Sequence, residues 1–314
     1  MKLTIGICAY NEARNIGGLL SNLLDQPLFD HQELLEIIVV SSGCLDGTFD
    51  IVRNFQGKDT RIKLVNQTSR QGKSSAQNII LKKAKGDVIV FVSADIYPAT
   101  GSIAILVDTI KGNIGGADSR VIILNESKGL VNFISRFIWG LHDRTLSHEN
   151  NRGSLSHIGG DMFAIQRGII SKIPAYVIND DAYMGILIRS QGYRIQFVSQ
   201  AVYYAFGPST IRDYISQRRR IIFGHQQLKR LFGQSPMVYR TLTLLRPLDG
   251  IYIFFEQIRE SRLHDLTKVF PMILLETISS FLAHWDNLQK ADRHILWDQI
   301  KSTKILVRNE DAVG

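Results

Sequence analysis

The sequence predicts an α/β protein in which a doubly wound, mostly parallel sheet is flanked by helices and followed by a C-terminal helical appendage. Strand-like and helix-like patterns alternate, with short loops, through roughly the first 225 residues, as in sheets built with right-handed crossovers. The segment Val88–Val92 is a continuous apolar run rich in β-branched residues, typical of a strand buried on both faces. We therefore expect an α/β domain over residues 1–224. Residues 225–314 are expected to form a helical extension that contacts a membrane surface or a second subunit.

Each expected strand is a short, mostly apolar run that ends in a polar turn. In chain order the expected strands are Leu3–Ala9, Leu34–Val40, Arg61–Asn66, Val88–Val92, a strand after the glycine turn within Ile158–Ile165, Tyr193–Val198 and Val202–Tyr204. The expected helices have apolar residues at helical spacing or start at a capping residue. They are Glu12–Asp25, Asp46–Phe55, Gly72–Ala84, one beginning near Ala99, Lys128–His142, Ile178–Ser190 and one beginning at Thr210 or Asp213.

The predicted central strand ends on Ser93-Ala94-Asp95, which places a carboxylate at the edge of the sheet. In open parallel sheets, ligands bind beyond the carboxyl ends of the strands. A carboxylate there, followed by Pro98, suits a divalent cation that carries a pyrophosphate. The alternative is that Asp95 only caps the helix beginning near Ala99.

The composition is that of an ordinary globular protein, with 45% hydrophobic and 21% charged residues among 314. Cys8 and Cys44 show neither CxxC pairing nor zinc spacing, so we expect reduced thiols in a cytosolic compartment. The first residues show no signal-peptide pattern. A nicotinamide-binding Rossmann site is excluded because the first strand-to-helix turn lacks GxGxxG. A P-loop is excluded because Gln67 stands where the Walker A motif ahead of Lys73 needs glycine.

The formal net charge of +8 is concentrated in one stretch. Between Arg189 and Arg240, nine Arg and Lys residues stand against a single acid, Asp213. Such a concentration indicates an anionic partner, whether a phosphate, a lipid headgroup or nucleic acid. A nucleic-acid partner is not expected, because the basic cluster lacks interleaved aromatic residues.

Apolar segments in the C-terminal half predict contact with a membrane surface. Leu248–Ile258 and Val269–Trp285 are short or interrupted by Glu or Pro, so we expect no membrane span. Apolar positions beside basic helices instead suit peripheral association. The helix Lys128–His142 is either a core-packing helix or a second interfacial one.

Six short motifs follow one another, each at the end of an expected strand or the start of an expected helix. They are Ala9-Tyr10-Asn11-Glu12, the loop Val40–Thr48, Arg70–Asn78, Ser93-Ala94-Asp95, Asn179-Asp180-Asp181 and Gln217–Ile221. In this order they resemble the motifs of family 2 glycosyltransferases, which are inverting enzymes of the GT-A fold. The resemblance covers about Leu3 to Gly224 and implies a GT-A-type sheet.

The resemblance implies a role for each motif residue. Asp181 would be the catalytic base, with Asp180 beside it raising its pKa. Asp95 would hold Mg2+ or Mn2+. The donor-binding residues would be Ala9, Tyr10, Glu12, Ser42, Lys73, Asp95, Gln217 and Arg220, and the acceptor side would be lined by Gly159, Gly160 and Asp161.

The chain departs from the family pattern at four positions. Ser41 and Ser42 replace two acids of the second motif, and a Ser hydroxyl accepts hydrogen bonds without charge, so the donor base is left open between UDP and GDP. Ser93 replaces the first acid of the DxD motif and leaves one carboxylate for the metal. Ile221 replaces the usual Trp of the QxxRW motif, which disfavours a polysaccharide polymerase because an aromatic platform for sugars is lost.

These features predict a metal-dependent enzyme that transfers a single sugar, with inversion, from a nucleotide-diphosphate donor. The expected acceptor is a glycan hydroxyl or a polyprenyl-linked lipid, as in cell-envelope glycan synthesis. The expected location is cytoplasmic, peripheral on the inner face of the cell membrane. The alternatives are a processive polysaccharide synthase, a nucleotidyltransferase and a catalytically silent, basic membrane-binding module.

Overall fold

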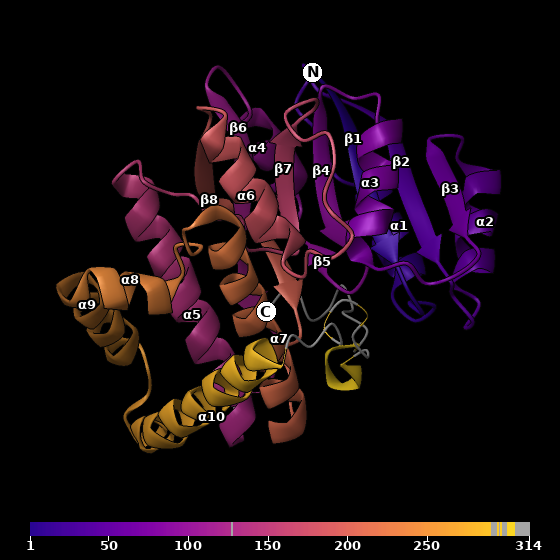
Figure 1. Ribbon diagram of the computed structural model, residues 1–314. Coiled ribbons are helices and arrows are strands. Elements are labelled where there is room, and N and C mark those ends of the chain that lie inside the picture. The colour runs from indigo at the N-terminus through magenta and orange to yellow at the C-terminus, as the bar shows by residue number, and fades with distance from the viewer. Residues whose placement is uncertain (127, 290–293, 295, 297–299, 305–314) are drawn as a thin grey trace.

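The computed structural model describes residues 1–126, 128–289, 294, 296 and 300–304. A mixed eight-stranded sheet forms its centre, with strand order β3-β2-β1-β4-β7-β6-β8-β5 (Figure 1). The strands are β1 (Lys2–Ala9), β2 (Glu33–Ser42), β3 (Ile62–Gln67), β4 (Val88–Ser93), β5 (Tyr97–Pro98), β6 (Ile114–Ile123), β7 (Met162–Gln166) and β8 (Arg194–Ala205).

Helices cover the sheet and continue beyond it toward the C-terminal end. They are α1 (Ile16–Leu24), α2 (Thr48–Lys58), α3 (Lys73–Lys83), α4 (Ser102–Asp108), α5 (Leu130–Asn151), α6 (Asp180–Ser190), α7 (Ile211–Phe232), α8 (Tyr239–Leu245), α9 (Pro247–Arg259) and α10 (Val269–Leu288). The short 3-10 segments η1 (Leu263–Lys268) and η3 (Lys301–Thr303) precede α10 and follow it.

The sheet has an apolar core on each face, because successive strand residues point to opposite sides. In β4, Val88, Val90 and Val92 pack on one face with α1, α2 and α4, and Ile89 and Phe91 pack on the other with α3 and α6. Every residue from Val88 to Val92 is buried. The prediction of a strand buried on both faces is therefore confirmed.

The predicted doubly wound, mostly parallel architecture is confirmed. The pairs β1–β2, β1–β4, β2–β3 and β6–β8 are parallel, whereas β4–β7, β6–β7 and β5–β8 are antiparallel. The carboxyl ends of β1, β2 and β4 meet at one edge, where Cys8 pairs with Ser93 and Ala9 with Ser41. This edge is where the predicted binding residues gather.

Three details of the sheet differ from the expectation, the first of which is the two-residue strand β5, which was not predicted. Strand β6 was not predicted, because Gly115 and Gly116 interrupt its apolar pattern. Their lack of side chains is required there, since an added Cβ on Gly115 would lie 2.7 Å from Ile169 Cδ1. The two expected late strands form one strand, β8, whose register against β6 shifts between Val198 and Val202.

The C-terminal helices share a separate apolar cluster with α5 rather than with the sheet. Phe137 of α5, Leu242 of α8, Ile253 of α9 and Met272 of α10 belong to it. Helix α5 extends to Asn151, well past the expected end, and its buried stripe explains why it packs as a core helix. The expected boundary between residues 224 and 225 lies inside α7, so this helix belongs to both expected parts. Residues 305–314 of the expected extension lie outside the described residues.

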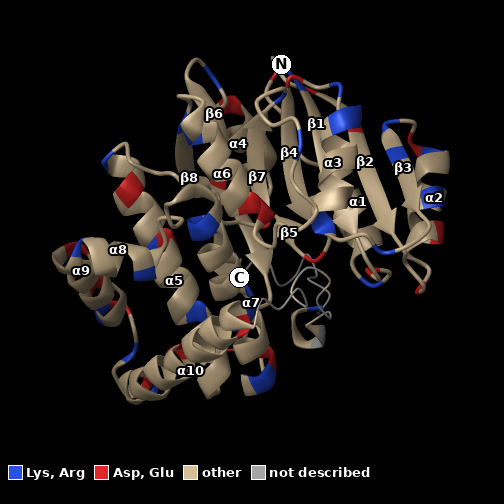
Figure 2. Ribbon diagram, viewed as in Figure 1, with Lys and Arg blue, Asp and Glu red and all other residues tan. Residues whose placement is uncertain are grey.

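The cluster Arg218–Arg220 is not a free basic patch. Arg218 forms two hydrogen bonds with Glu276 of α10, at 2.7 and 2.8 Å, and Arg219 pairs with Asp286 of the same helix. Acidic residues therefore face basic ones where α7 and α10 meet (Figure 2). The pairing weakens the alternative of an anion-binding module built on this cluster, because two of its three charges are already compensated.

One helical stretch is longer and more continuous than the sequence pattern indicated. Leu263–Leu288 is long and apolar enough by length and composition, with a mean hydropathy of 1.4 over its best window, of which 22% is buried. The sequence pattern predicted interruptions at Pro271 and Glu276, but α10 continues through both. Pro271 lies in the first turn of α10, where proline is tolerated.

Candidate active site

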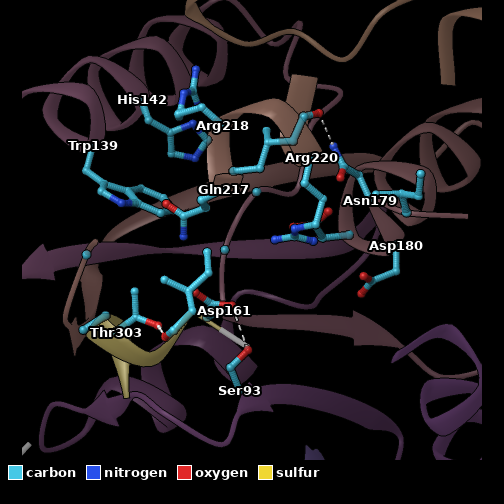
Figure 3. Close-up of a pocket in the computed structure, with 18 of the residues that line it drawn as sticks. Ser93, Trp139, His142, Asp161, Asn179, Asp180, Gln217, Arg218, Arg220 and Thr303 are labelled. Atoms are coloured by element: carbon cyan, nitrogen blue, oxygen red, sulfur yellow. Dashed lines mark hydrogen bonds between the residues drawn. The ribbon is translucent and has the colours of Figure 1, made fainter. Parts of the chain in front are cut away.

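A large cavity of about 580 Å3 opens at the carboxyl ends of β1, β2 and β4. Every residue assigned a binding or catalytic role from the sequence lines it: Ala9, Tyr10, Glu12, Ser42, Lys73, Asp95, Gly159, Gly160, Asp161, Asp180, Asp181, Gln217 and Arg220. In Figure 3, Trp139, His142 and Gln217 lie across the cavity from Ser93, Asp161 and Thr303. Arg220 projects into the space between these two groups.

The first and third motifs together present an aromatic ring and a cation to the cavity. The guanidinium of Arg70 lies over the ring of Tyr10, 4.1 Å from its centroid, as in a cation–π contact. Asn11 holds this turn in the left-handed region with φ of 53°, and its side chain accepts a hydrogen bond from the Leu45 amide at 2.8 Å. Such a flat, polar surface suits a nucleotide base.

The two serines of the second motif differ in their position. Ser41 is fully buried within β2, whereas Ser42 lines the cavity and its hydroxyl accepts a hydrogen bond from the Gln71 amide at 3.5 Å. Gly43 follows with φ of 65°, and an added Cβ would lie 2.6 Å from the Arg70 nitrogen. The second and third motifs are therefore in direct contact through a glycine.

Lys73 and Asp180 form a partly buried ion pair beneath the cavity. Lys73 Nζ lies 3.4 Å from Asp180 Oδ2, and the Gln77 side chain donates a hydrogen bond to the same oxygen. Burial opposes the charge on Lys73, but Asp180, Asp161 and Asp181 together raise its pKa above the ordinary value. The ammonium at the N-terminus of α3 therefore stays charged and favours an anion there.

Asp181, the second residue of α6, is half-buried at the cavity wall. Burial, reinforced by the neighbouring Asp180, raises the pKa of Asp181 to about 7. One of its oxygens accepts a hydrogen bond from the Ala182 amide at 2.7 Å. A carboxylate with a pKa close to neutral is suited to general base catalysis.

Arg220 and Gln217 reach the cavity from α7, whose N-terminus is capped by the Thr210 hydroxyl. Burial lowers the pKa of Arg220, while Asp180, Asp181 and Asp161 act in the opposite direction. An arginine stays protonated under such conditions. Arg220 therefore brings a positive charge close to Asp180, Asp181 and Asp161.

Asp95 faces the cavity and holds a cation from another part of the chain. Its Oδ2 atom lies 2.8 Å from Lys304 Nζ, and the same ammonium donates a hydrogen bond to Glu12. Ser93 does not turn toward Asp95; its hydroxyl donates to Asp161 at 2.7 Å. The Ser93 hydroxyl is uncharged and points toward Asp161. It therefore does not supply the second metal-binding carboxylate that the DxD motif has at this position.

The residues around Asp95 fit a divalent cation that arrives with its nucleotide. A carboxylate that already binds an ammonium is a suitable anionic oxygen ligand, and Mg2+ and Mn2+ take remaining ligands from phosphates and water. Among the described residues, no group of three or more His, Cys, Asp or Glu side chains has the geometry of a preformed metal site. Asp95 would thus be the protein ligand.

Gly159 and Gly160 of the predicted acceptor loop have no room for a side chain, because neighbouring side chains pack closely against them. An added Cβ on Gly159 would collide with the His157 ring, and one on Gly160 would lie 2.8 Å from Asp118 Oδ1. Asp118, fully buried on β6, accepts a hydrogen bond from the Gly159 amide at 2.9 Å. Burial raises the pKa of Asp118 to about 8, so it anchors this loop as a largely protonated carboxyl.

Three histidines that the sequence motifs did not indicate also line the cavity. One of them, His142, lies across it from Ser93 and Asp161 (Figure 3). The ring centroids of His142 and His157 are 5.6 Å apart, and those of His157 and His225 are 5.9 Å apart. Burial lowers the pKa of His142 to about 4 and of His225 to about 3. With Trp139 beside them, they make an uncharged, hydrogen-bonding surface that suits sugar hydroxyls.

Some of the cavity residues outside the motifs could have been recognised from the sequence, and others could not. Trp139 and His142 are three residues apart on an expected helix, so they share one face. His157 directly precedes the glycine turn. Lys304 had no local signal, because it meets residues more than 200 positions earlier in the chain.

Comparison with known proteins finds similarity to glycosyltransferases. Residues 4–173 match the sequence model of the family described as Glycosyl transferase family 2. The chain is 29% identical over 238 residues to "Probable glycosyltransferase YdaM" of Bacillus subtilis, which covers 72% of this chain and 55% of that protein. It is 34% identical over 96 residues to "Dolichyl-phosphate beta-glucosyltransferase ALG5C" of Trichomonas vaginalis, covering 29% of this chain and 28% of that protein.

A solved structure shares the fold. The mannosyltransferase PcManGT from Pyrobaculum calidifontis, in complex with GDP-Man and Mn2+, superposes with a TM-score of 0.62 and covers 92% of this chain and 87% of its own. The sequences are 20% identical. The match to the curated relatives is shorter, since this chain spans about half of the length of YdaM.

Proposed function

Because this chain belongs to glycosyltransferase family 2, we propose that it transfers a single sugar from a nucleotide-diphosphate donor to an acceptor hydroxyl or a lipid-linked acceptor, with inversion. The observation that carries this proposal is that every predicted site residue, from the six motifs and from the glycine turn at Gly159–Asp161, lines one cavity. The donor is UDP- or GDP-linked. A GDP-sugar has the additional support that PcManGT binds GDP-Man.

In the proposed mechanism, Asp181 accepts the proton of the acceptor hydroxyl. The acceptor oxygen forms a bond to the anomeric carbon from one face, while the bond from that carbon to the diphosphate oxygen breaks on the other, so the configuration inverts. The proton moves to Asp181, and the bonding electrons leave with the nucleoside diphosphate. Lys73 and Arg220 lie where they stabilise the negative charge on the diphosphate.

We propose that the reaction depends on Mg2+ or Mn2+ bound through Asp95. When bound, such a cation neutralises negative charge on the diphosphate. The support is the carboxylate at the end of β4 together with its ability to hold a positive charge, as it does with Lys304.

Calorimetric titration of UDP and GDP, with and without Mn2+, tests the donor and the metal together. We expect one nucleotide to bind the wild type in a metal-dependent manner. Asp95→Ala should weaken that binding by about 100-fold, because even outer-shell partners of a metal change its affinity by about 10–100-fold. Asp30→Ala, at an exposed position far from the cavity, is the matched control. Equal metal-dependent binding by the wild type and Asp95→Ala would rule out this metal site.

The proposal of a single transfer rests on Ile221. Its backbone carbonyl accepts a hydrogen bond from the Asn179 side chain at 3.0 Å, and its side chain lines the cavity where a polymerase of the family carries Trp. A processive enzyme would yield a ladder of products from one acceptor, whereas we expect a single product mass.

We also propose that the protein binds the inner, cytoplasmic face of the cell membrane through its C-terminal helices. Most of its exposed large apolar side chains lie in α8, α9, η1 and α10, at one end of the molecule (Figure 1). This apolar C-terminal surface consists of Leu244, Leu245, Leu248, Ile251, Tyr252, Phe255, Leu263, Phe270, Ile273, Leu274, Ile278, Phe281, Trp285 and Leu288. Exposed Arg240, Arg259 and Arg262 lie among them, as suits anionic lipids.

The cavity reaches this surface through α8, which supports a lipid-linked acceptor. Val238, Tyr239 and Leu244 line the cavity, and Leu244 is at the same time 75% exposed. An acceptor headgroup could therefore enter the cavity while its hydrocarbon chain stays at the membrane surface. Helix α10 is held against α7 by the Arg218–Glu276 and Arg219–Asp286 pairs, which favours a helix lying on the bilayer over one crossing it.

Vesicle sedimentation tests the membrane contact. Phe270→Ser combined with Phe281→Ser should weaken binding to vesicles containing anionic lipid by at least tenfold, because each buried phenylalanine contributes about 1.5–3 kcal/mol. Both side chains are largely exposed, so the fold should persist. Phe29→Ser, at an exposed site on another part of the chain, is the control. Unchanged vesicle binding in the double variant would contradict the proposed surface.

A further inference from the structure

The segment from Ile300 to Lys304 lies in the same cavity as the motifs of the N-terminal half. Ile300, Thr303 and Lys304 line the cavity, and Thr303 is buried. Figure 3 shows Thr303 on the side of the cavity that also carries Ser93 and Asp161. The segment therefore covers part of the space on the predicted donor side.

Lys304 joins two carboxylates that come from different motifs. Its ammonium lies 2.8 Å from Asp95 Oδ2 and donates a second hydrogen bond to Glu12. Glu12 is nearly inaccessible to solvent, with 5% of its side chain exposed, whereas the side chains of Asp95 and Lys304 are about a quarter exposed, 23% and 25%. Two carboxylates, from the loops that follow β1 and β4, thus bind the ammonium of the C-terminal segment.

A lysine ammonium and a divalent cation have overlapping requirements at this position. Both need an anionic oxygen, and the ammonium is a compact point charge. Asp95 lines the cavity, and its Oδ2 atom already accepts a hydrogen bond from Lys304. A second positive ion on the same carboxylate would be repelled at such short distance.

We propose that Lys304 is an internal cation that competes with the divalent metal for Asp95, so that residues 300–304 form an autoinhibitory strap that the metal–nucleotide complex displaces. The inference rests on the proposed function, because it takes the donor site as given. It adds that two features raise the metal concentration needed for nucleotide binding. One is the C-terminal segment, and the other is the presence of Ser93 where the DxD motif has an acid.

The strap has few anchors, which makes displacement feasible. Within the described part of the chain, it makes hydrogen bonds to the body through two residues only. Lys304 binds Asp95 and Glu12, while the Ser302 hydroxyl donates to Asp213 and accepts from the Ser209 amide at 3.4 Å. The diphosphate offers the metal several further ligands that the ammonium lacks, so donor and metal together outcompete Lys304.

The test compares Lys304→Ala and Lys304→Arg with the wild type. Mn2+ is titrated at fixed GDP and at fixed UDP, and binding is measured by calorimetry without any acceptor. Coupled sites commonly change affinity by about 5- to 150-fold, and for one partly exposed ion pair we expect Lys304→Ala to need about tenfold less Mn2+. Lys304→Arg keeps the charge and should resemble the wild type. Lys63→Ala, at an exposed position of β3, is the matched control.

Hydrogen exchange gives a second readout that does not depend on affinity. Amides of residues 300–304 should exchange faster in the wild type once Mn2+ and the nucleotide are bound. Unchanged protection on binding, or an equal or higher Mn2+ requirement in Lys304→Ala, would overturn the strap. If the wild type and Lys304→Ala bind nucleotide equally well at the same Mn2+ concentration, only this inference is wrong. If neither protein binds nucleotide, the proposed donor site itself is wrong.

Discussion

Asp181→Asn should abolish sugar transfer and leave nucleotide binding nearly unchanged. The asparagine amide keeps the size and the hydrogen bond to the Ala182 amide but cannot accept the acceptor's proton. A positioned general base contributes about 10²- to 10⁴-fold to a rate, so we expect a loss within this range in single-turnover assays. Asp50→Asn, in the exposed first turn of α2, controls for the loss of an acid at a helix N-terminus.

The pH dependence of the wild type provides a second check on the same residue. Burial and Asp180 raise the pKa of Asp181 to about 7, and only the deprotonated form accepts a proton. kcat/KM should therefore fall about tenfold per pH unit below pH 7 and level off above it. If the acid limb persisted unchanged in the residual activity of Asp181→Asn, another group would be the base.

Lys73→Met should remove donor binding and also destabilise the fold. Its ammonium compensates the buried Asp180 carboxylate from 3.4 Å, and removing one partner of a fully buried pair costs about 3–5 kcal/mol. Because 27% of the Lys73 side chain is exposed, we expect a smaller loss of about 2 kcal/mol in the free energy of unfolding, measured by denaturant titration. Lys83→Met, at the exposed end of the same helix, should change neither property.

The double variant Lys73→Met with Asp180→Asn separates the two effects. Neutralising the buried acid should restore most of the stability, since no charge is then left without compensation. Nucleotide binding should stay lost, because the cation that meets the diphosphate is still missing. Restored binding in the double variant would show that Lys73 acts only by supporting Asp180.

Local patterns were sufficient for the parallel half of the sheet and for the binding loops. Strands β1, β2 and β4 are short apolar runs closed by polar turns, and their carboxyl ends lie together for topological reasons. Strand β6 could not be predicted in the same way, because its glycines have no side-chain pattern and are selected by contacts with Ile169 and Ile188.

The parts of the site that escaped prediction depend on distant contacts. Asp118 in a strand gives no indication that it holds the Gly159 amide, and Lys304 gives none that it reaches Asp95. Arg218 and Arg219 were counted as free positive charge because Glu276 and Asp286 lie about 60 residues further on. Charge counting along a chain assumes that opposite charges far away do not meet, and here they do.

Helix α7 contacts both α10 and the cavity, and this limits which parts of the protein can be exchanged. Successive residues of a helix point about 100° apart. Arg218 and Arg219 pair with acids of α10, while Arg218 and Arg220 both line the cavity. A graft of the C-terminal helices from a relative would leave two arginines opposed by nothing, unless the donor sequence supplies matching acids. The C-terminal helices and the sheet domain are therefore joined through one helix, and the two parts cannot be exchanged independently of the charges on α7.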